Sequence, residues 1–146
     1  MNKILNKYLN SSLIYAVLAL VGGVFYREFT KFNDFAGDTM LSVVHTHYFV
    51  LGMILFLLLL LLEKTFAFST EKTGKIVLAY NVGLNLTVIM FIVRGVLQVL
   101  ETSLSKGLTA AISGFAGIGH IILGVSIILL ILQIKKSVGE GNKNAN

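Results

Sequence analysis

Four long apolar stretches, each free of charged residues, occupy most of the chain. They run over residues 8–26, 39–62, 76–93 and 107–134. Each is close to the ~20 residues that a helix needs to cross the hydrocarbon core of a bilayer. The pattern therefore predicts an all-α integral membrane protein, a four-helix bundle that forms a single membrane domain over residues 1–146. We expect the spans at about residues 9–27, 40–62, 76–100 and 110–134.

The composition supports a membrane protein and excludes a soluble enzyme. Hydrophobic residues make up 55% of the 146 residues and charged residues 13%, and the mean hydropathy is +0.84. These values lie far from the balance of a soluble globular domain. Because four crossings use most of the chain, no loop is long enough for a catalytic domain. Any chemistry must take place inside a multi-pass protein of the plasma membrane, in contact with the lipid bilayer.

The distribution of positive charge predicts the orientation. Lysines are concentrated before the first stretch, between the second and third, and after the fourth: Lys3, Lys7, Lys64, Lys72, Lys75, Lys135, Lys136 and Lys143. The other two connections contain only Arg27, Lys31 and Lys106. The positive-inside rule then predicts that both termini are cytoplasmic. Since topology explains the net charge of +5, no nucleic-acid partner is expected. The chain has no proline, so the helices should be straight.

Three histidines are the candidate metal ligands. The chain contains no cysteine, which excludes thiolate metal sites and leaves His45, His47 and His120 as its strong transition-metal ligands. Residues two apart on a regular helix point about 200° away from each other, so His45 and His47 cannot both face one metal. His45 shares its helix face with Phe49 and Gly52, and the glycine is expected to leave an open slot beside the imidazole.

Small residues form a strip on the helix face of His120. They are Ser113, Ala116, Gly117 and Gly124. Such a strip is typical of close packing between membrane helices. It is also suited to form a flat wall for a planar ligand that His120 binds. The sequence leaves both interpretations open.

Arg94 lies inside the third predicted span, residues 76–100, which also contains Asn81, Asn85 and Thr87. A cation within a membrane is costly, so it needs a partner or must extend to the interface. Arg94 and the three histidines all fall within the predicted outer half of the membrane, which suggests one site.

Haem b accounts for this set of groups. Imidazole nitrogens would ligate the iron, and Arg94, helped by Arg27, would face the propionates. A copper or zinc site built from the three histidines is a competing assignment. A third assignment is purely structural, in which the histidines belong to a polar seam and only fix the packing of the helices.

The run from Val44 to Gly52, VHTHYFVLG, resembles the second-helix motif of the haem–copper oxidase superfamily. It is most similar to the cbb3-type catalytic subunit and to NnrS-like membrane proteins. In those proteins the first histidine is an axial ligand of a b-type haem. The resemblance therefore implies that His45 is an axial ligand, with His47 or His120 as the second. The chain also resembles a small bacterial family of four-span membrane proteins of unknown function.

The same resemblance extends to architecture. The oxidase subunit consists of three groups of four helices, and this chain is similar to one such group. This implies a homo-oligomer, a dimer or a trimer, that rebuilds a similar enclosure. No adjacent histidine pair or further copper ligand set is present, so reduction of oxygen to water is not expected.

These observations predict a haem b-binding membrane protein with a redox, gas-sensing or haem-handling role, whose electron donor has no recognisable motif. A non-catalytic membrane interaction or assembly factor is the alternative. A small-molecule transporter is a third and weaker hypothesis, because every Asp and Glu lies in a loop or at a helix end.

Overall fold

The computed structural model describes residues 3–144, with side chains up to residue 140. Residues 1–2 and 145–146 of the expected domain, and the side chain of Lys143, lie outside the described part. Within residues 3–144 the chain is helical, with no strand. Four helices are long and apolar enough to cross a membrane: α1 (Lys3–Phe32), Met40–Phe66, α4 (Glu71–Val99) and α5 (Lys106–Asn144). The all-α, four-span prediction is confirmed, although α1, α4 and α5 each begin several residues before the predicted span.

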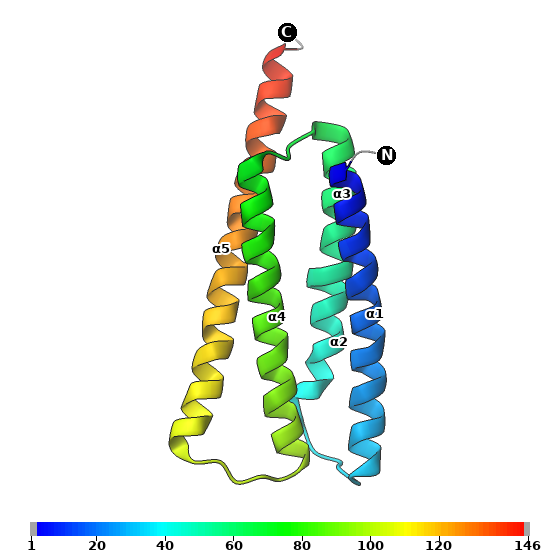
Figure 1. Ribbon diagram of the computed structural model, residues 1–146, viewed down its shortest axis with the longest axis vertical. Coiled ribbons are helices and arrows are strands. Elements are labelled where there is room, and N and C mark those ends of the chain that lie inside the picture. The colour runs from blue at the N-terminus through cyan, green and yellow to red at the C-terminus, as the bar shows by residue number, and fades with distance from the viewer. Residues whose placement is uncertain (1–2, 145–146) are drawn as a thin grey trace.

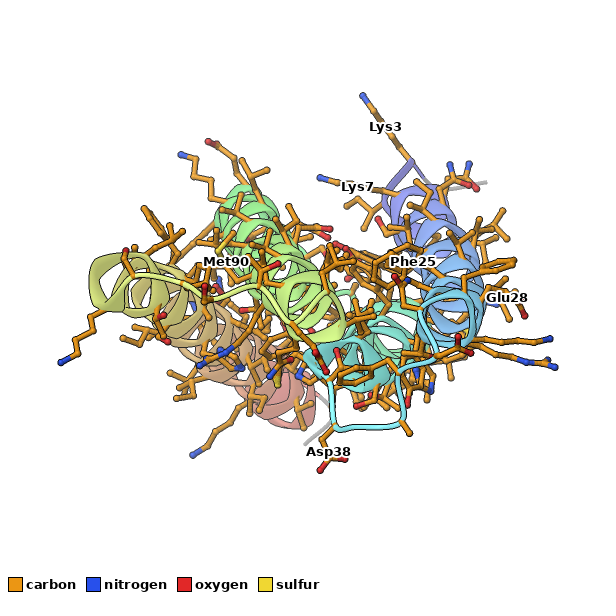
Figure 2. All side chains as sticks on the ribbon, turned by 90° about the horizontal axis from the view of Figure 1, so that it is seen from below. Lys3, Lys7, Phe25, Glu28, Asp38 and Met90 are labelled. Atoms are coloured by element: carbon orange, nitrogen blue, oxygen red, sulfur yellow. The ribbon has the colours of Figure 1, made fainter. Side chains whose placement is uncertain are left out.

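The spans alternate in direction (Figure 1). We call the end with the start of α1, the α3–α4 connection and the C-terminal part of α5 the terminal end. The opposite end, which holds the α1–η1 and α4–α5 connections, is the loop end. Seen from the loop end, α1 and α5 lie at opposite edges, with α4 and the second span between them (Figure 2). Accordingly, α1 packs on the second span, whereas α5 packs along α4 and touches α3.

Helix α4 is the central helix. Its buried residues occur every three or four positions along its whole length: Thr73, Ile76, Val77, Tyr80, Gly83, Leu84, Thr87, Val88, Phe91, Gly95 and Val99. This spacing is typical of a helix covered by neighbours. Thr70 fixes its start, because the Thr70 and Thr73 side chains bond reciprocally to each other's backbone N–H groups.

The second span is not a regular α-helix, which corrects the prediction of straight, regular helices. It comprises a 3₁₀ turn η1 (Met40–Val43), a short α2 (Val44–His47), a π-helical segment η2 (Tyr48–Ile54) and α3 (Leu55–Phe66). Side chains from neighbouring helices stabilise η2. Ser12 donates a hydrogen bond to the Met53 carbonyl at 3.0 Å, and the Tyr80 hydroxyl donates to the Leu51 carbonyl. The wide turn therefore arises from tertiary contacts rather than from proline.

A polar network joins three spans within the apolar core. The Tyr15 hydroxyl donates to the Asn81 Oδ1 atom and accepts from the Asn85 Nδ2 atom at 2.9 Å. The Tyr48 hydroxyl donates to the Asn85 Oδ1 atom at 3.1 Å. Both amide groups also donate to carbonyls of α4 one turn earlier. Because these polar groups find partners inside the protein, the network stabilises one arrangement of α1, η2 and α4.

Candidate functional site

The start of the second span is anchored on the end of α4. The Gln98 Oε1 atom accepts a hydrogen bond from the Met40 N–H at 2.8 Å, and the Thr39 hydroxyl donates to the Gly95 carbonyl at 3.0 Å. Gly95 permits this contact, because a Cβ atom there would lie 2.6 Å from the Leu41 nitrogen. These contacts fix the position of the two histidines that follow.

His45 and His47 face different neighbours, as their spacing predicts. His45 faces α1, where a Cβ atom on Gly23 would lie 3.7 Å from the His45 Cβ atom. The His45 Nδ1 atom is buried and has no hydrogen-bond partner among the described residues. His47 faces the other side, with its ring centre 4.9 Å from that of Phe91 on α4.

His47 and His120 come together, whereas His45 does not join them. The two imidazole centres are 6.4 Å apart and their planes are nearly perpendicular, at 88°. The Phe91 ring lies beside both, with its centre 5.6 Å from that of His120. The sequence pattern did not single out Phe91, although it stands one helical turn before Arg94. We call His47 and His120 the histidine pair; it connects the second span to α5 over Phe91 of α4.

The two imidazoles of the pair have the same local hydrogen bond. The His47 Nδ1 atom bonds to the Val43 carbonyl at 2.8 Å, and the His120 Nδ1 atom bonds to the Ala116 carbonyl at 2.8 Å. A backbone carbonyl can only accept, so each Nδ1 carries the proton. A ring protonated at Nδ1 alone presents the lone pair of Nε2, the atom with which such a tethered histidine binds a metal. No third His, Asp or Glu completes a cluster with the pair within the described residues.

Arg94 lies on α4 near the loop end, one turn beyond Phe91. Its Nη1 atom donates to the Ser113 hydroxyl of α5 at 3.3 Å. It forms no ion pair within the part of the chain that has described side chains. Arg94 and Glu101 contribute to an open pocket of about 290 Å³. Its guanidinium is therefore available to an anionic group at this end.

Arg27 is not brought to Arg94. It lies on α1, where its Nε atom is 3.7 Å from the carboxylate of the adjacent Glu28. Its side chain is 81% exposed, and α1 occupies the edge of the molecule opposite α5 (Figure 2). Among the described residues, Arg27 therefore does not lie with Arg94, which it was expected to help at the propionates.

The slot expected at Gly52 is filled, which corrects that prediction. A Cβ atom on Gly52 would lie 2.5 Å from the Tyr15 Cγ atom, so the tyrosine ring packs directly on the glycine backbone. Gly52 is thus a contact point between η2 and α1, and it leaves no open slot at its own position.

The small residues of α5 fall into two groups. Gly119 packs against α4, since a Cβ atom there would lie 2.6 Å from the Thr87 Oγ1 atom. By contrast, Gly114, Gly117 and Gly124 have open space beside them. Close packing therefore explains Gly119, whereas most of the strip that includes His120 is not covered by another described helix.

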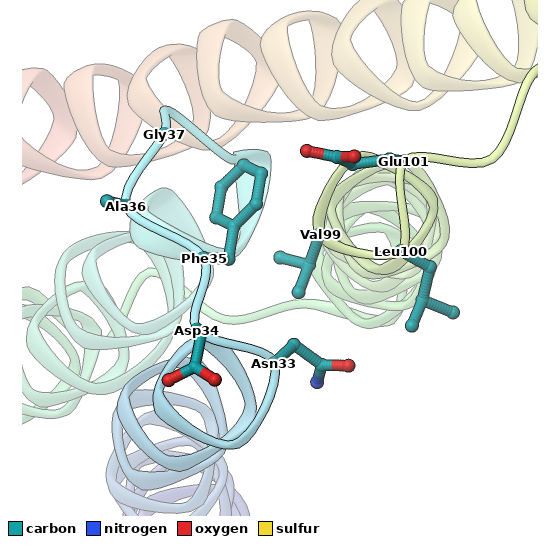
Figure 3. A pocket seen from close by; sticks show the side chains of 8 residues that line it. All are labelled: Asn33, Asp34, Phe35, Ala36, Gly37, Val99, Leu100 and Glu101. Carbon is teal, nitrogen blue, oxygen red and sulfur yellow. The ribbon is translucent and has the colours of Figure 1, made fainter.

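A separate pocket of about 420 Å³ lies between the two loops at the loop end (Figure 3). Its lining includes Asn33, Asp34, Phe35 and Glu101, but none of the predicted haem-binding residues. The two carboxylates do not point toward each other (Figure 3). The pocket thus lies apart from the histidine pair.

Four apolar helices with a polar network buried among them define a multi-pass helical membrane protein. The chain belongs to the family described as "Protein of unknown function (DUF2871)", whose model matches residues 5–137. No curated protein and no solved structure matches the chain. The comparisons give no support to the resemblance of residues 44–52 to the haem–copper oxidases, which stays a prediction.

Proposed function

We propose that this protein is a membrane metalloprotein whose metal centre is bound by His47 and His120. The observation that carries the proposal is the shared tether of the two rings. Each Nδ1–H donates to a carbonyl four residues earlier, which fixes the tautomer and leaves Nε2 as the nitrogen that a metal could bind.

Haem b is the form of the centre that the sequence predicts. Two features support it: the resemblance of residues 44–52 to an oxidase helix, and the Arg94 guanidinium, which forms no ion pair among the described side chains and could meet a propionate. When bound by two imidazoles, haem supplies one-electron chemistry, and this favours a redox role over gas sensing or haem handling. In this proposal His47 and His120, rather than His45, would hold the iron, because the imidazoles of those two residues lie together.

The fit of haem depends on Phe91. A porphyrin held between the two imidazoles would extend sideways from its iron, and the Phe91 ring lies beside the point midway between them. With the Phe91 ring in this position, the space between the two imidazoles can hold an iron ion but not the porphyrin around it. Haem fits the pair only where the Phe91 ring is displaced.

The test of the proposed function is the metal content of the purified full-length protein. Cells supplied with iron, copper and zinc should yield wild-type protein with one bound metal centre, identified by mass spectrometry and visible absorption. His47→Ala and His120→Ala should each lose it. His45→Ala is the matched control and should retain it. Metal-free wild-type protein that takes up neither haemin nor an added ion would reject the proposal.

An interaction or assembly factor, in which the histidines only fix packing, is the second candidate. The observation in its favour is the open space beside Gly114, Gly117 and Gly124, since such a face allows another helix to approach closely. A second copy would fit the predicted dimer or trimer. This candidate predicts that Gly117→Leu changes the oligomeric state, whereas His47→Ala and His120→Ala lower the yield without a spectral change.

A further inference from the structure

The arrangement around the histidine pair discriminates between a single ion and a large cofactor. The centres of His47, Phe91 and His120 form a triangle with sides of 4.9, 5.6 and 6.4 Å. Two imidazoles that share one ion through Nε2 in a linear arrangement have centres about 6 to 6.5 Å apart, because nitrogen–metal bonds are about 2 Å long. The observed separation agrees with this value. Phe91, nearly equidistant from both rings, occupies the place of the porphyrin rim.

The number and charge of the ligands restrict the ion. Zinc sites use three or four protein ligands, whereas only two imidazoles meet here and no carboxylate joins them within the described residues. The cost of desolvating an ion rises with the square of its charge, so a divalent ion between two neutral rings is poorly compensated. Monovalent copper binds imidazole, accepts two nitrogen ligands and carries a single charge.

We infer that the histidine pair binds one Cu⁺ ion, and that Phe91 is the residue that excludes porphyrin from it. This inference rests on the proposed function and specifies its metal. Phe91 is buried, at 8% exposure, and its ring lies against both imidazoles, so the ring has a fixed place. It determines the specificity of the site without contributing a ligand atom.

The first experiment titrates the purified, metal-free full chain in detergent with Cu⁺ under ascorbate and without oxygen, and separately with Zn²⁺ and with haemin. We expect one Cu⁺ per chain, with two-coordinate nitrogen ligation in the X-ray absorption spectrum. His47→Ala and His120→Ala should each weaken binding by about tenfold or more. His45→Ala should bind as the wild type does. Zn²⁺ that binds as tightly as Cu⁺ would overturn the choice of ion.

The second experiment changes the size of residue 91. Phe91→Ala should allow haemin to bind with the spectrum of a bis-imidazole haem, and Phe91→Leu, which retains bulk, should continue to exclude it. Wild-type protein that binds haemin through His47 and His120 would overturn the inference but leave the proposed function intact. Wild-type protein that binds neither haemin nor any ion would overturn both. The haemin titration of the wild type decides between these outcomes even if Phe91→Ala does not fold.

Discussion

Tyr15 contacts three other segments in the middle of the molecule. Its ring packs on Gly52 of η2 and stacks with Phe56 of α3, with ring centres 5.7 Å apart. Its hydroxyl bonds with Asn81 and Asn85 of α4. A single side chain thus combines apolar packing with a polar network, and a change at its contact points will affect both.

Gly52→Ala tests this contact. The new methyl group would overlap the Tyr15 ring, so we expect the free energy of unfolding to fall by about 1–3 kcal/mol, measured by thermal unfolding in detergent. Gly74→Ala is the matched control. Gly74 lies in the first turn of α4 with open space beside it, so alanine there should be neutral or stabilise by about 0.5–1 kcal/mol. Equal stability of the two variants would contradict the close contact.

At the scale of elements, the crossing of α4 and α5 positions His120. Gly83 and Gly119 allow the two backbones to approach, because Cβ atoms there would lie 2.7 Å from the Leu123 nitrogen and 2.6 Å from the Thr87 Oγ1 atom, respectively. Thr87 is fully buried, and its hydroxyl oxygen has no hydrogen-bond partner among the described residues. This close crossing places the His120 ring near that of Phe91.

Gly119→Leu tests the role of this crossing in metal binding. The leucine would force α5 away from α4, so we expect loss of stability and weaker metal binding by the pair, although residue 119 touches no ligand atom. Metal affinity, measured by competition with a chelator, is the readout. Gly124→Ala, beside open space, should leave affinity unchanged. Unaltered affinity in a folded Gly119→Leu protein would show that the crossing does not position the pair.

The sequence predicted the elements better than their internal geometry. Charge-free stretches located the four helices, and the two-residue spacing correctly separated His45 from His47. The π-helical turn at Tyr48–Ile54 could not be predicted, because it depends on donors from Ser12 and Tyr80, distant in the chain. For the same reason the sequence does not show that the Tyr15 ring fills the place beside Gly52. A glycine in the sequence shows where another part of the protein can approach the backbone closely, but not which helix or side chain does so.

At the scale of the whole molecule, the charged residues gather at the helix ends and mark two faces of a membrane. The second span and α4 are joined at the terminal end, where the buried Glu63 carboxylate accepts a hydrogen bond from the Ser69 N–H at 2.9 Å. Most lysines also lie at this end. The orientation that these lysines predict, with both termini cytoplasmic, stays a prediction.

Single-cysteine labelling measures this orientation without background, because the chain has no cysteine. Ser103→Cys lies in the α4–α5 connection and Lys136→Cys near the end of α5; both positions are exposed. A membrane-impermeant maleimide should label Ser103→Cys in intact cells and Lys136→Cys only after permeabilisation. Labelling of Lys136→Cys in intact cells would reverse the predicted topology.

Helix α5 is longer than a membrane is thick. Its 39 residues extend about 58 Å at ~1.5 Å per residue, against ~30 Å for the hydrocarbon core, and its C-terminal part projects beyond the other spans (Figure 1). Because α5 lies at an edge and packs chiefly on one neighbour, its C-terminal part is held along α4 only as far as α4 extends. The end of the molecule at which both termini lie therefore carries a helical surface outside the bundle, away from the histidine pair.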